Sequence, residues 1–215
     1  LLCASKGGAT RDGFTIRKKG QDMELSSASD RGVLYAAYDL LRRQQTGDLL
    51  SDGAVVTEMP SYDIRILNHW DNPDGTVERG YAGRSIWKWD ELPETVSPLY
   101  KEYARTNASV GINAVVLNNV NAKPQMLSTG MLRKVAVIAD VLRPYGIRTY
   151  LSVNFASPKA LGELPTADLL DADVQRWWKK KTKEIYRLIP DFGGFLVKAN
   201  SEGEPGPQDY GRTHA

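Results

Sequence analysis

The sequence contains few of the side chains from which metal sites and disulfides are built. Cys3 is its single cysteine, which excludes an intrachain disulfide framework and a metal site made of clustered cysteines. His69 and His214 are the only histidines, so a histidine-rich metal site is not expected either. We therefore expect no metal and no other cofactor.

Long apolar runs and phosphate-binding loops are also missing. No apolar run is long enough to span a bilayer. The turn after the first strand of the larger module described below lacks GxGxxG, and GxxxxGK(S/T) occurs nowhere, so a nucleotide-binding fold has no support. The net charge of +2 gives no reason to expect general affinity for nucleic acids or membranes. The basic run Lys179-Lys180-Lys181 is interpreted as a solvated helix face.

The overall composition is that of an ordinary soluble protein, with 215 residues, 41% hydrophobic and 25% charged. This length suits one large domain, or a small domain joined to part of another. The opening residues LLCASKGG are too short to assign as the end of a signal peptide, so cytoplasmic, periplasmic and secreted locations all stay open. The sequence does not begin with Met and stops just after a loop rich in Gly and Pro. We therefore expect a fragment.

Residues 1–59 are predicted to be a partial N-terminal α/β domain, with its boundary at Met59-Pro60. Apolar and polar residues alternate in part on either side of a turn at residues 18–21, which indicates a hairpin. A helix is predicted over GVLYAAYDLLRRQQTG, residues 32–47. The serine or aspartate before it can cap its start, and Gly47 can end it.

Residues 60–215 alternate between strands and helices. Four strands with three intervening helices fit either a doubly wound sheet or half of a TIM (β/α)8 barrel. The region is much shorter than the roughly 250 residues of a full barrel, so we expect the first half, about four βα units. The expected strands are 63–69, 112–118, 148–153 and 194–197, and the expected helices are 94–110, 130–144 and 171–189.

The stretch GFLVKANSEGEPGP brings a cation, an amide and a carboxylate together. Because strand side chains alternate between faces, Leu196, Lys198, Asn200 and Glu202 share one face if the strand continues that far. These groups would lie where a parallel strand ends, a usual place for chemistry in α/β proteins. Glu202 is the best candidate for a general acid, but a loop carboxylate that caps a backbone amide fits the pattern equally well. Glu204 is a weaker alternative acid.

Lys198 could bind an anionic substrate group or pair with Glu202. A permanent ion pair would lower the pKa of Glu202, which is unsuitable for a general acid. If a substrate carboxylate takes up the lysine charge, Glu202 can stay protonated near neutrality. The pattern alone favours the structural ion pair.

The loop after the first predicted strand of this region, NHWDNPDGTVERGYAGRSIWKWDE, is too long for a simple connector. Aromatic faces beside hydrogen-bonding groups suit a sugar ring, which has apolar faces and a rim of hydroxyls. Trp70 lies nearest the strand end and is expected to face a pocket. Trp87 and Trp89 are expected to pack the loop, and His69 is expected to be structural.

Asparagines follow the next two predicted strands: Asn118, Asn119 and Asn121 after one, and Asn154 after the other. Asparagine is common in the turns that end strands, so each alone is weak evidence for binding. Together they would place hydrogen-bonding groups on the same rim as Glu202.

Two long segments, RILNHWDNPDGTVERGYAGRSIWKWDELP and GFLVKANSEGEPGPQDYGRTHA, resemble the family 67 glycoside hydrolases, the xylan α-1,2-glucuronidases. The segment SSASDRGVLYAAYDLLR resembles the helix of the small α/β domain in front of their barrel. The resemblance covers essentially the whole chain. It implies an inverting enzyme that removes (4-O-methyl)glucuronic acid from the terminal xylose of short xylo-oligosaccharides. It implies no cofactor, no nucleic-acid partner and no membrane span, and a homodimer is one option for the full-length protein.

The resemblance also suggests individual roles. Glu202 matches the family's general acid, and Lys198 matches a lysine that binds the uronic carboxylate. Trp70 matches a tryptophan that lines the uronic acid pocket, and Val120 matches a residue near the methoxy group. Asn200, on the predicted face of Lys198, is the remaining candidate for substrate binding.

The general-base carboxylates of the family have no counterpart in this sequence. Inverting hydrolysis needs a second carboxyl about 6.5–9.5 Å from the acid. Glu204 and Asp209 lie too close to Glu202 in sequence to promise the opposite face of the sugar. Two hypotheses follow: the chain is the N-terminal part of an α-glucuronidase and is inactive alone, or it is a non-catalytic uronic-acid-binding protein or remnant.

Overall fold

The protein is described from a computed structural model that covers residues 2–6, 12–121, 123–201 and 203–213. The chain divides into two compact units, Leu1–Arg65 with Tyr103–Asn113 and Ile66–Glu102 with Ala114–Ala215. Within the described ranges, no helix is long and apolar enough to cross a membrane.

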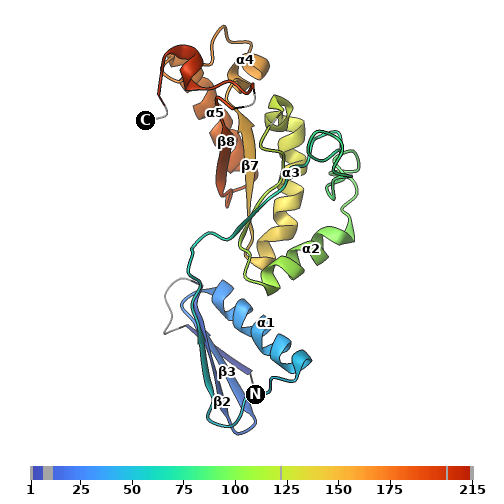
Figure 1. The fold of residues 1–215 in the computed structure, drawn as a ribbon, viewed down its shortest axis with the longest axis vertical. Coiled ribbons are helices and arrows are strands. Elements are labelled where there is room, and N and C mark those ends of the chain that lie inside the picture. Colours follow the sequence, from blue (N-terminus) through green and yellow to red (C-terminus); the bar gives the residue numbers. More distant parts are fainter. Residues whose placement is uncertain (1, 7–11, 122, 202, 214–215) are drawn as a thin grey trace. The chain divides into compact units, whose positions relative to one another are not determined.

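The first unit contains a four-stranded sheet formed by β1 (Leu2–Lys6), β2 (Phe14–Lys19), β3 (Asp22–Ser27) and β4 (Val55–Glu58). The strand order is β1-β3-β2-β4; β1 runs parallel to β3, and the other neighbours are antiparallel. Helix α1 (Asp30–Thr46) packs against β2 and β3 (Figure 1). The core between helix and sheet consists of Phe14, Ile16, Leu25, Tyr35, Ala36 and Leu40.

The predicted hairpin and helix of this unit are confirmed. β2 and β3 pair around a turn in which Gly20 has a φ of 60°. Ser29 Oγ accepts a hydrogen bond from the backbone N–H of Gly32 at 3.0 Å, which caps α1. Gly47 ends the helix with a φ of 76°, a conformation that glycine adopts without steric cost. The sequence pattern did not reveal β1 and β4, the two outer strands.

A buried carboxylate, Asp12, joins several segments of the first unit. Its Oδ2 accepts hydrogen bonds from Arg65 Nη2 at 2.9 Å and from Asn113 Nδ2 at 3.2 Å. Its Oδ1 accepts from Arg31 Nε at 3.0 Å and from Ser29 Oγ at 3.3 Å. Burial opposes ionisation, but the hydrogen bond from Arg65 and the charge of Arg31 outweigh it and lower the pKa of Asp12. The carboxylate is therefore charged and fully engaged in the folded unit.

The second unit contains a sheet of four parallel strands, β5 (Ile66–Asn68), β6 (Ala114–Val116), β7 (Arg148–Asn154) and β8 (Gly194–Lys198). They follow one another in the order β5-β6-β7-β8. Figure 1 shows β7 and β8 side by side. Helix α3 contacts both β7 and α5. The helices along this part of the chain are α2 (Pro98–Ser109), α3 (Thr129–Leu142), α4 (Ser157–Gly162) and α5 (Ala172–Leu188), with 3-10 turns at η1 (Pro124–Leu127), η2 (Arg143–Tyr145) and η3 (Pro207–Tyr210).

The order of strands and long helices agrees with the prediction, whereas several boundaries differ. All three residues of β6 are buried, as expected for a parallel strand covered on both faces. β5 is shorter than predicted; before it, the backbone N–H of Arg65 donates to the side chain of Asn113 at 2.8 Å. α2 begins at Pro98, since proline is favoured in the first turn of a helix. The short helix α4 was not predicted.

Asp12→Asn should lower the free energy of unfolding by about 2–4 kcal/mol at neutral pH, because the amide leaves two arginines without their buried counter-charge. The pKa of Asp12 is lowered by folding, so its stabilisation is present above the unfolded value of about 3.9 and is lost as the pH falls from there through the folded pKa. Denaturant unfolding of both proteins at a series of pH values should therefore show converging stabilities at low pH.

The exposed aspartate variant Asp90→Asn is the control and should match the parent protein at every pH. A stability difference for Asp12→Asn that stayed constant down to low pH would contradict the assignment of a charged, lowered-pKa carboxylate.

Candidate functional site

The carboxyl ends of β5, β6, β7 and β8 lie along one edge of the sheet, because the four strands are parallel. We call this the carboxyl edge. Trp70 and Asn121 lie in the segments that follow β5 and β6, while Asn154 and Lys198 are the last residues of β7 and β8. The sheet thus assembles on one edge residues that are far apart in the sequence.

Asp71 fixes the start of the loop that follows β5. Its side chain is buried, with Oδ2 accepting from Ser85 Oγ at 2.5 Å and Oδ1 3.4 Å from Nδ1 of His69. Its backbone carbonyl accepts from the N–H of Asn119 at 2.8 Å, which joins the loop to the segment after β6. The adjacent Trp70 is 37% exposed, so its ring is accessible beside an anchored turn.

Trp87 and Trp89 pack inside the loop, as predicted, with exposed fractions of 1% and 3%. The Trp87 ring centroid lies 5.4 Å from that of His69 and 5.2 Å from that of Tyr100. The Tyr100 hydroxyl also accepts a hydrogen bond from the backbone N–H of Lys88 at 2.8 Å. The long loop therefore has an apolar core of its own, and His69 is structural, as expected.

The asparagines after β6 do not all line the carboxyl edge. Asn118 Oδ1 accepts from the N–H of Ser152 at 2.9 Å, and its Nδ2 donates to the Ser152 carbonyl at 3.0 Å, which extends the ladder to β7. Asn119 Nδ2 donates to Asn72 Oδ1 at 3.2 Å and to the Glu78 carbonyl at 3.1 Å. The predicted rim of asparagines was therefore too broad, because the amides of Asn118 and Asn119 replace backbone partners inside the fold.

Lys198 and Asn121 meet at the carboxyl edge. The Lys198 ammonium donates to Asn121 Oδ1 at 2.6 Å. The half-buried Val120 precedes Asn121 in the same segment. One strand over, Asn154 Nδ2 donates to Glu204 Oε2 at 2.7 Å. Each of the two edge asparagines thus holds a charged residue that belongs to β8 or to the loop after it.

The face predicted to run from β8 to Glu202 ends at Lys198. β8 stops there, and Asn200 has a φ of 51°, which interrupts the alternation of side chains. Asn200 Oδ1 accepts from the N–H of Gln208 at 3.2 Å, and a Cβ on Gly206 would lie only 2.0 Å from that oxygen. The Asn200 side chain therefore stabilises the loop through contacts with Gly206 and Gln208 of the same loop. Glu202, the predicted acid, lies outside the residues that the structure describes, as does His214.

The two other carboxylates of this loop already have partners. The backbone N–H of Glu204 donates to the carbonyl of Ser201 at 3.0 Å, while its side chain binds Asn154. Asp209 Oδ2 accepts from the N–H of Gly206 at 2.8 Å. Both carboxylates thus stabilise the loop, and neither is placed as a second catalytic carboxyl.

The end of the loop is attached to the segment before α5. The Tyr210 hydroxyl accepts from the N–H of Ala167 at 3.1 Å, and Arg212 Nη2 lies 2.9 Å from Asp168 Oδ2. The hydrogen bond from Arg212 lowers the pKa of Asp168. These contacts hold the end of the loop against the segment before α5.

The sequence places Asn121 and Asn154 at the ends of strands but does not show which residues they bind. A signal was available, since each asparagine follows a strand of the same parallel sheet as the cation and carboxylate of GFLVKANSEGEPGP. Among the described residues, no group of three or more His, Cys, Asp or Glu side chains is placed to hold a metal ion.

Residues 44–215 match the family model of the glycosyl hydrolase family 67 middle domain. The chain belongs to glycosyl hydrolase family 67. It is 47% identical over 205 residues to the probable alpha-glucuronidase A of Neosartorya fischeri, covering 95% of this chain and 24% of that protein. It is 45% identical over 209 residues to the alpha-glucuronidase A of Emericella nidulans, with coverage of 95% and 24%. The family 67 chain thus spans about a quarter of the length of these curated relatives.

A solved GH138 enzyme targeting pectin rhamnogalacturonan II has a similar fold, with a TM-score of 0.62 at 13% sequence identity. The match covers 91% of the family 67 chain and 25% of the GH138 chain. At this identity the likeness concerns the fold alone.

Asn118→Ala should lower the free energy of unfolding of the family 67 chain by about 1–3 kcal/mol, because it leaves buried backbone groups of Ser152 without these partners. Asn121→Ala is the matched control. It should cost less than about 1 kcal/mol, since water can replace the amide at a half-buried position. Denaturant unfolding of the two variants measures the difference. An equal loss of unfolding free energy in both variants would contradict the assignment of Asn118 to folding and of Asn121 to the carboxyl edge.

Proposed function

We propose that the protein is an inverting glycoside hydrolase that removes (4-O-methyl)glucuronic acid from xylo-oligosaccharides. The relatives named above are alpha-glucuronidases. The observation that carries the proposal is the placement of Lys198 at the carboxyl edge, where its ammonium donates to Asn121 after β6, the strand beside β5 and the exposed Trp70 that follows it. A cation for a uronic carboxylate and a ring for a sugar face are the two groups that such a substrate needs.

In this proposal each candidate has a distinct role. Glu202 protonates the leaving oxygen, and Lys198 binds the uronic carboxylate. Trp70 packs on the sugar, and Val120 lies near the 4-O-methyl group. Asn200 has its Nδ2 to offer to the substrate, while its Oδ1 accepts from the loop backbone.

Substrate binding would also set the protonation state of the acid. A lysine close to Glu202 lowers the pKa of the carboxyl, which opposes its role as a proton donor. A substrate carboxylate that binds Lys198 offsets this charge and raises the pKa of Glu202 toward the working pH. The charge of the substrate would then activate the acid that cleaves it.

The catalytic base is assigned to another part of the longer protein. The base of an inverting enzyme stands about 6.5–9.5 Å from the acid and activates a water on the opposite face of the sugar. Glu204 and Asp209 hold the loop instead, through Asn154 and Gly206. On this view the family 67 chain binds substrate and supplies the acid, and it does not turn over by itself.

The fold that supports this function is proposed to be the first half of a TIM (β/α)8 barrel, residues 60–215, after a partial N-terminal domain, residues 1–59. The sequential strand order suits a barrel rather than a doubly wound sheet. The outer strands carry exposed apolar residues, with Ile66 at 40% and Val197 at 52%. An apolar hollow of about 370 Å³ on β7 and β8 is where a further helix would pack; it is lined by Val153, Phe155, Leu169, Gln175, Trp178, Phe195 and Val197.

A non-catalytic uronic-acid-binding protein is the second candidate function. It is favoured by the engagement of both Glu204 and Asp209 in the loop, which leaves no placed base among the described residues. The reading frame of the encoding DNA distinguishes the two. A frame that continues into further barrel strands bearing carboxylates supports the hydrolase, and a stop codon after Ala215 supports the binding protein.

The hydrolase proposal predicts that a protein of the length of its curated relatives releases uronic acid from aldouronic xylo-oligosaccharides, whereas residues 1–215 alone do not. In the longer protein, Glu202→Gln should lower kcat about 10²- to 10⁴-fold, because the leaving oxygen is no longer protonated. The exposed variant Glu94→Gln is the control and should keep the parent activity. Release of uronic acid by residues 1–215 would place the base within this chain and overturn the account.

The half-barrel proposal predicts self-association of residues 1–215 when they are produced alone. Open strand edges and uncovered apolar surface favour pairing between copies. Size-exclusion chromatography with light scattering should therefore show oligomers or aggregates, and the longer protein should lack them. A monodisperse monomer that unfolds cooperatively would count against the half-barrel.

A further inference from the structure

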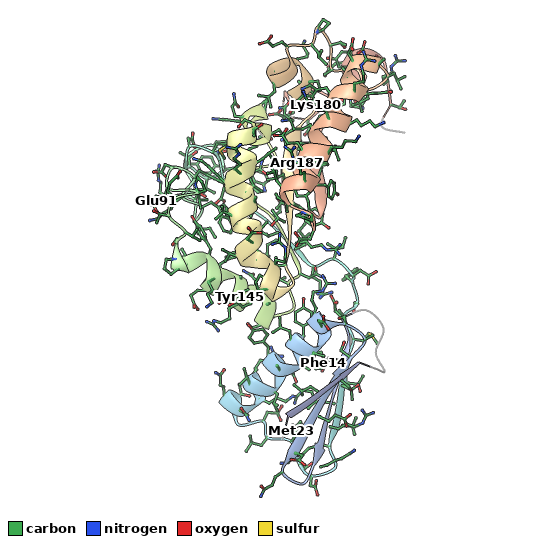
Figure 2. All side chains as sticks on the ribbon, turned by 180° about the vertical axis from the view of Figure 1, so that it is seen from behind. Phe14, Met23, Glu91, Tyr145, Lys180 and Arg187 are labelled. Atoms are coloured by element: carbon green, nitrogen blue, oxygen red, sulfur yellow. The ribbon has the colours of Figure 1, made fainter. Side chains whose placement is uncertain are left out.

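Helix α5 carries a row of basic residues on its exposed side. Arg176, Lys180, Lys183 and Arg187 recur at helical spacing, with Lys179 beside them, and all five are exposed. Figure 2 labels Lys180 and Arg187 along this helix. We call these five residues the cationic face.

Several basic residues elsewhere in the second unit pair with acidic side chains. Arg143 lies 2.5 Å from Asp140 and 2.8 Å from Asp191, and Lys88 lies 3.0 Å from Glu91. A solvated helix surface usually mixes the two signs in this way. The pairing of basic residues on α5 can be compared with these examples.

Three residues of the cationic face lack such a pairing with a described acidic side chain. In the part of the chain that the structure describes, Lys179, Lys180 and Lys183 have no carboxylate within 4.0 Å. Glu184 lies among them, but its Oε2 accepts from Lys181 at 2.8 Å. Several positive charges of the face are therefore available to a ligand.

The spacing of these charges has a cost for the helix. Arg176 and Lys180, Lys179 and Lys183, and Lys183 and Arg187 are each four residues apart, the distance at which like charges on a helix repel. A bound polyanion would remove this repulsion. The row from Arg176 to Arg187 is about 16 Å long at the helical rise, enough for an extended chain rather than a single small anion.

The cationic face also contains a groove. Residues of α5 and Thr129 at the start of α3 line a groove of about 720 Å³. Thr129 Oγ1 donates to Glu184 Oε1 at 2.5 Å, so the groove's one lining carboxylate has a hydrogen bond on each oxygen. A ligand in the groove meets cations whose nearest acid is already bound.

We propose that the cationic face binds a polysaccharide that carries uronic acid carboxylates, at a site separate from the carboxyl edge. The choice of polymer rests on the proposed function. The net charge of the chain is only +2, so the positive surface is local and does not suit long duplex nucleic acid.

The test is co-sedimentation of a protein of the length of its curated relatives with insoluble glucuronoxylan, compared with the same polymer after its carboxyl groups have been reduced. The variant Lys180→Glu/Lys183→Glu/Arg187→Glu should bind the acidic polymer roughly tenfold less than the parent. The triple variant Lys101→Glu/Arg148→Glu/Lys159→Glu changes the net charge equally at exposed positions away from the face, and it should bind like the parent. Both triples are first checked by circular dichroism for a native fold.

Binding of the parent protein to the two polymers tests the proposal without relying on the fold of any variant. Its binding should fall roughly tenfold on the carboxyl-reduced polymer and should weaken as salt is added. Equal binding to both polymers, equal loss in the two triple variants, or equally tight binding of duplex DNA would overturn the proposal.

Short aldouronic oligosaccharides separate this proposal from the proposed function. Lys198→Ala should lower their binding, whereas the α5 triple should bind them like the parent, because Lys198 lies at the carboxyl edge and not on α5. If Lys198→Ala abolished binding to the polymer while the α5 triple kept it, the carboxyl edge alone would bind the polymer and the cationic face would be refuted.

Discussion

Parallel pairing of β5 to β8 in chain order is the constraint on which the rest of the second unit depends. It sends every strand in one direction, so that all four carboxyl ends share an edge. It also forces each connection to return along the sheet, which explains the alternation of strands with α3 and α5. Residues as distant in sequence as Asn121 and Lys198 therefore come within hydrogen-bond distance.

The polar residues of this edge have two different roles in the structure. A strand end buries backbone groups that need partners, and Asn118 supplies them to β7 with both ends of its amide. Asn121 and Asn154 direct their amides to charged side chains instead. The same residue type thus serves folding at one position and the arrangement of charges at another, and only the partner tells them apart.

Elements with a strong local signal could be predicted from the sequence. The cap at Ser29, the glycine end at Gly47 and the apolar run of β6 each follow from a few neighbouring residues. β1, β4 and α4 could not be predicted, because their place depends on pairing or packing with distant segments. Asn200 shows the same limit, since its positive φ arises from contacts with residues of the loop that follow it.

The contact between Lys198 and Asn121 bears on how a lysine can serve an acid catalyst. An amide oxygen offers a dipole and no charge, so this hydrogen bond orients the ammonium without neutralising it. A uronic carboxylate that binds there would exchange a protein partner of the ammonium for its own negative charge. In the proposed mechanism, this exchange couples recognition of the uronic carboxylate to protonation of Glu202.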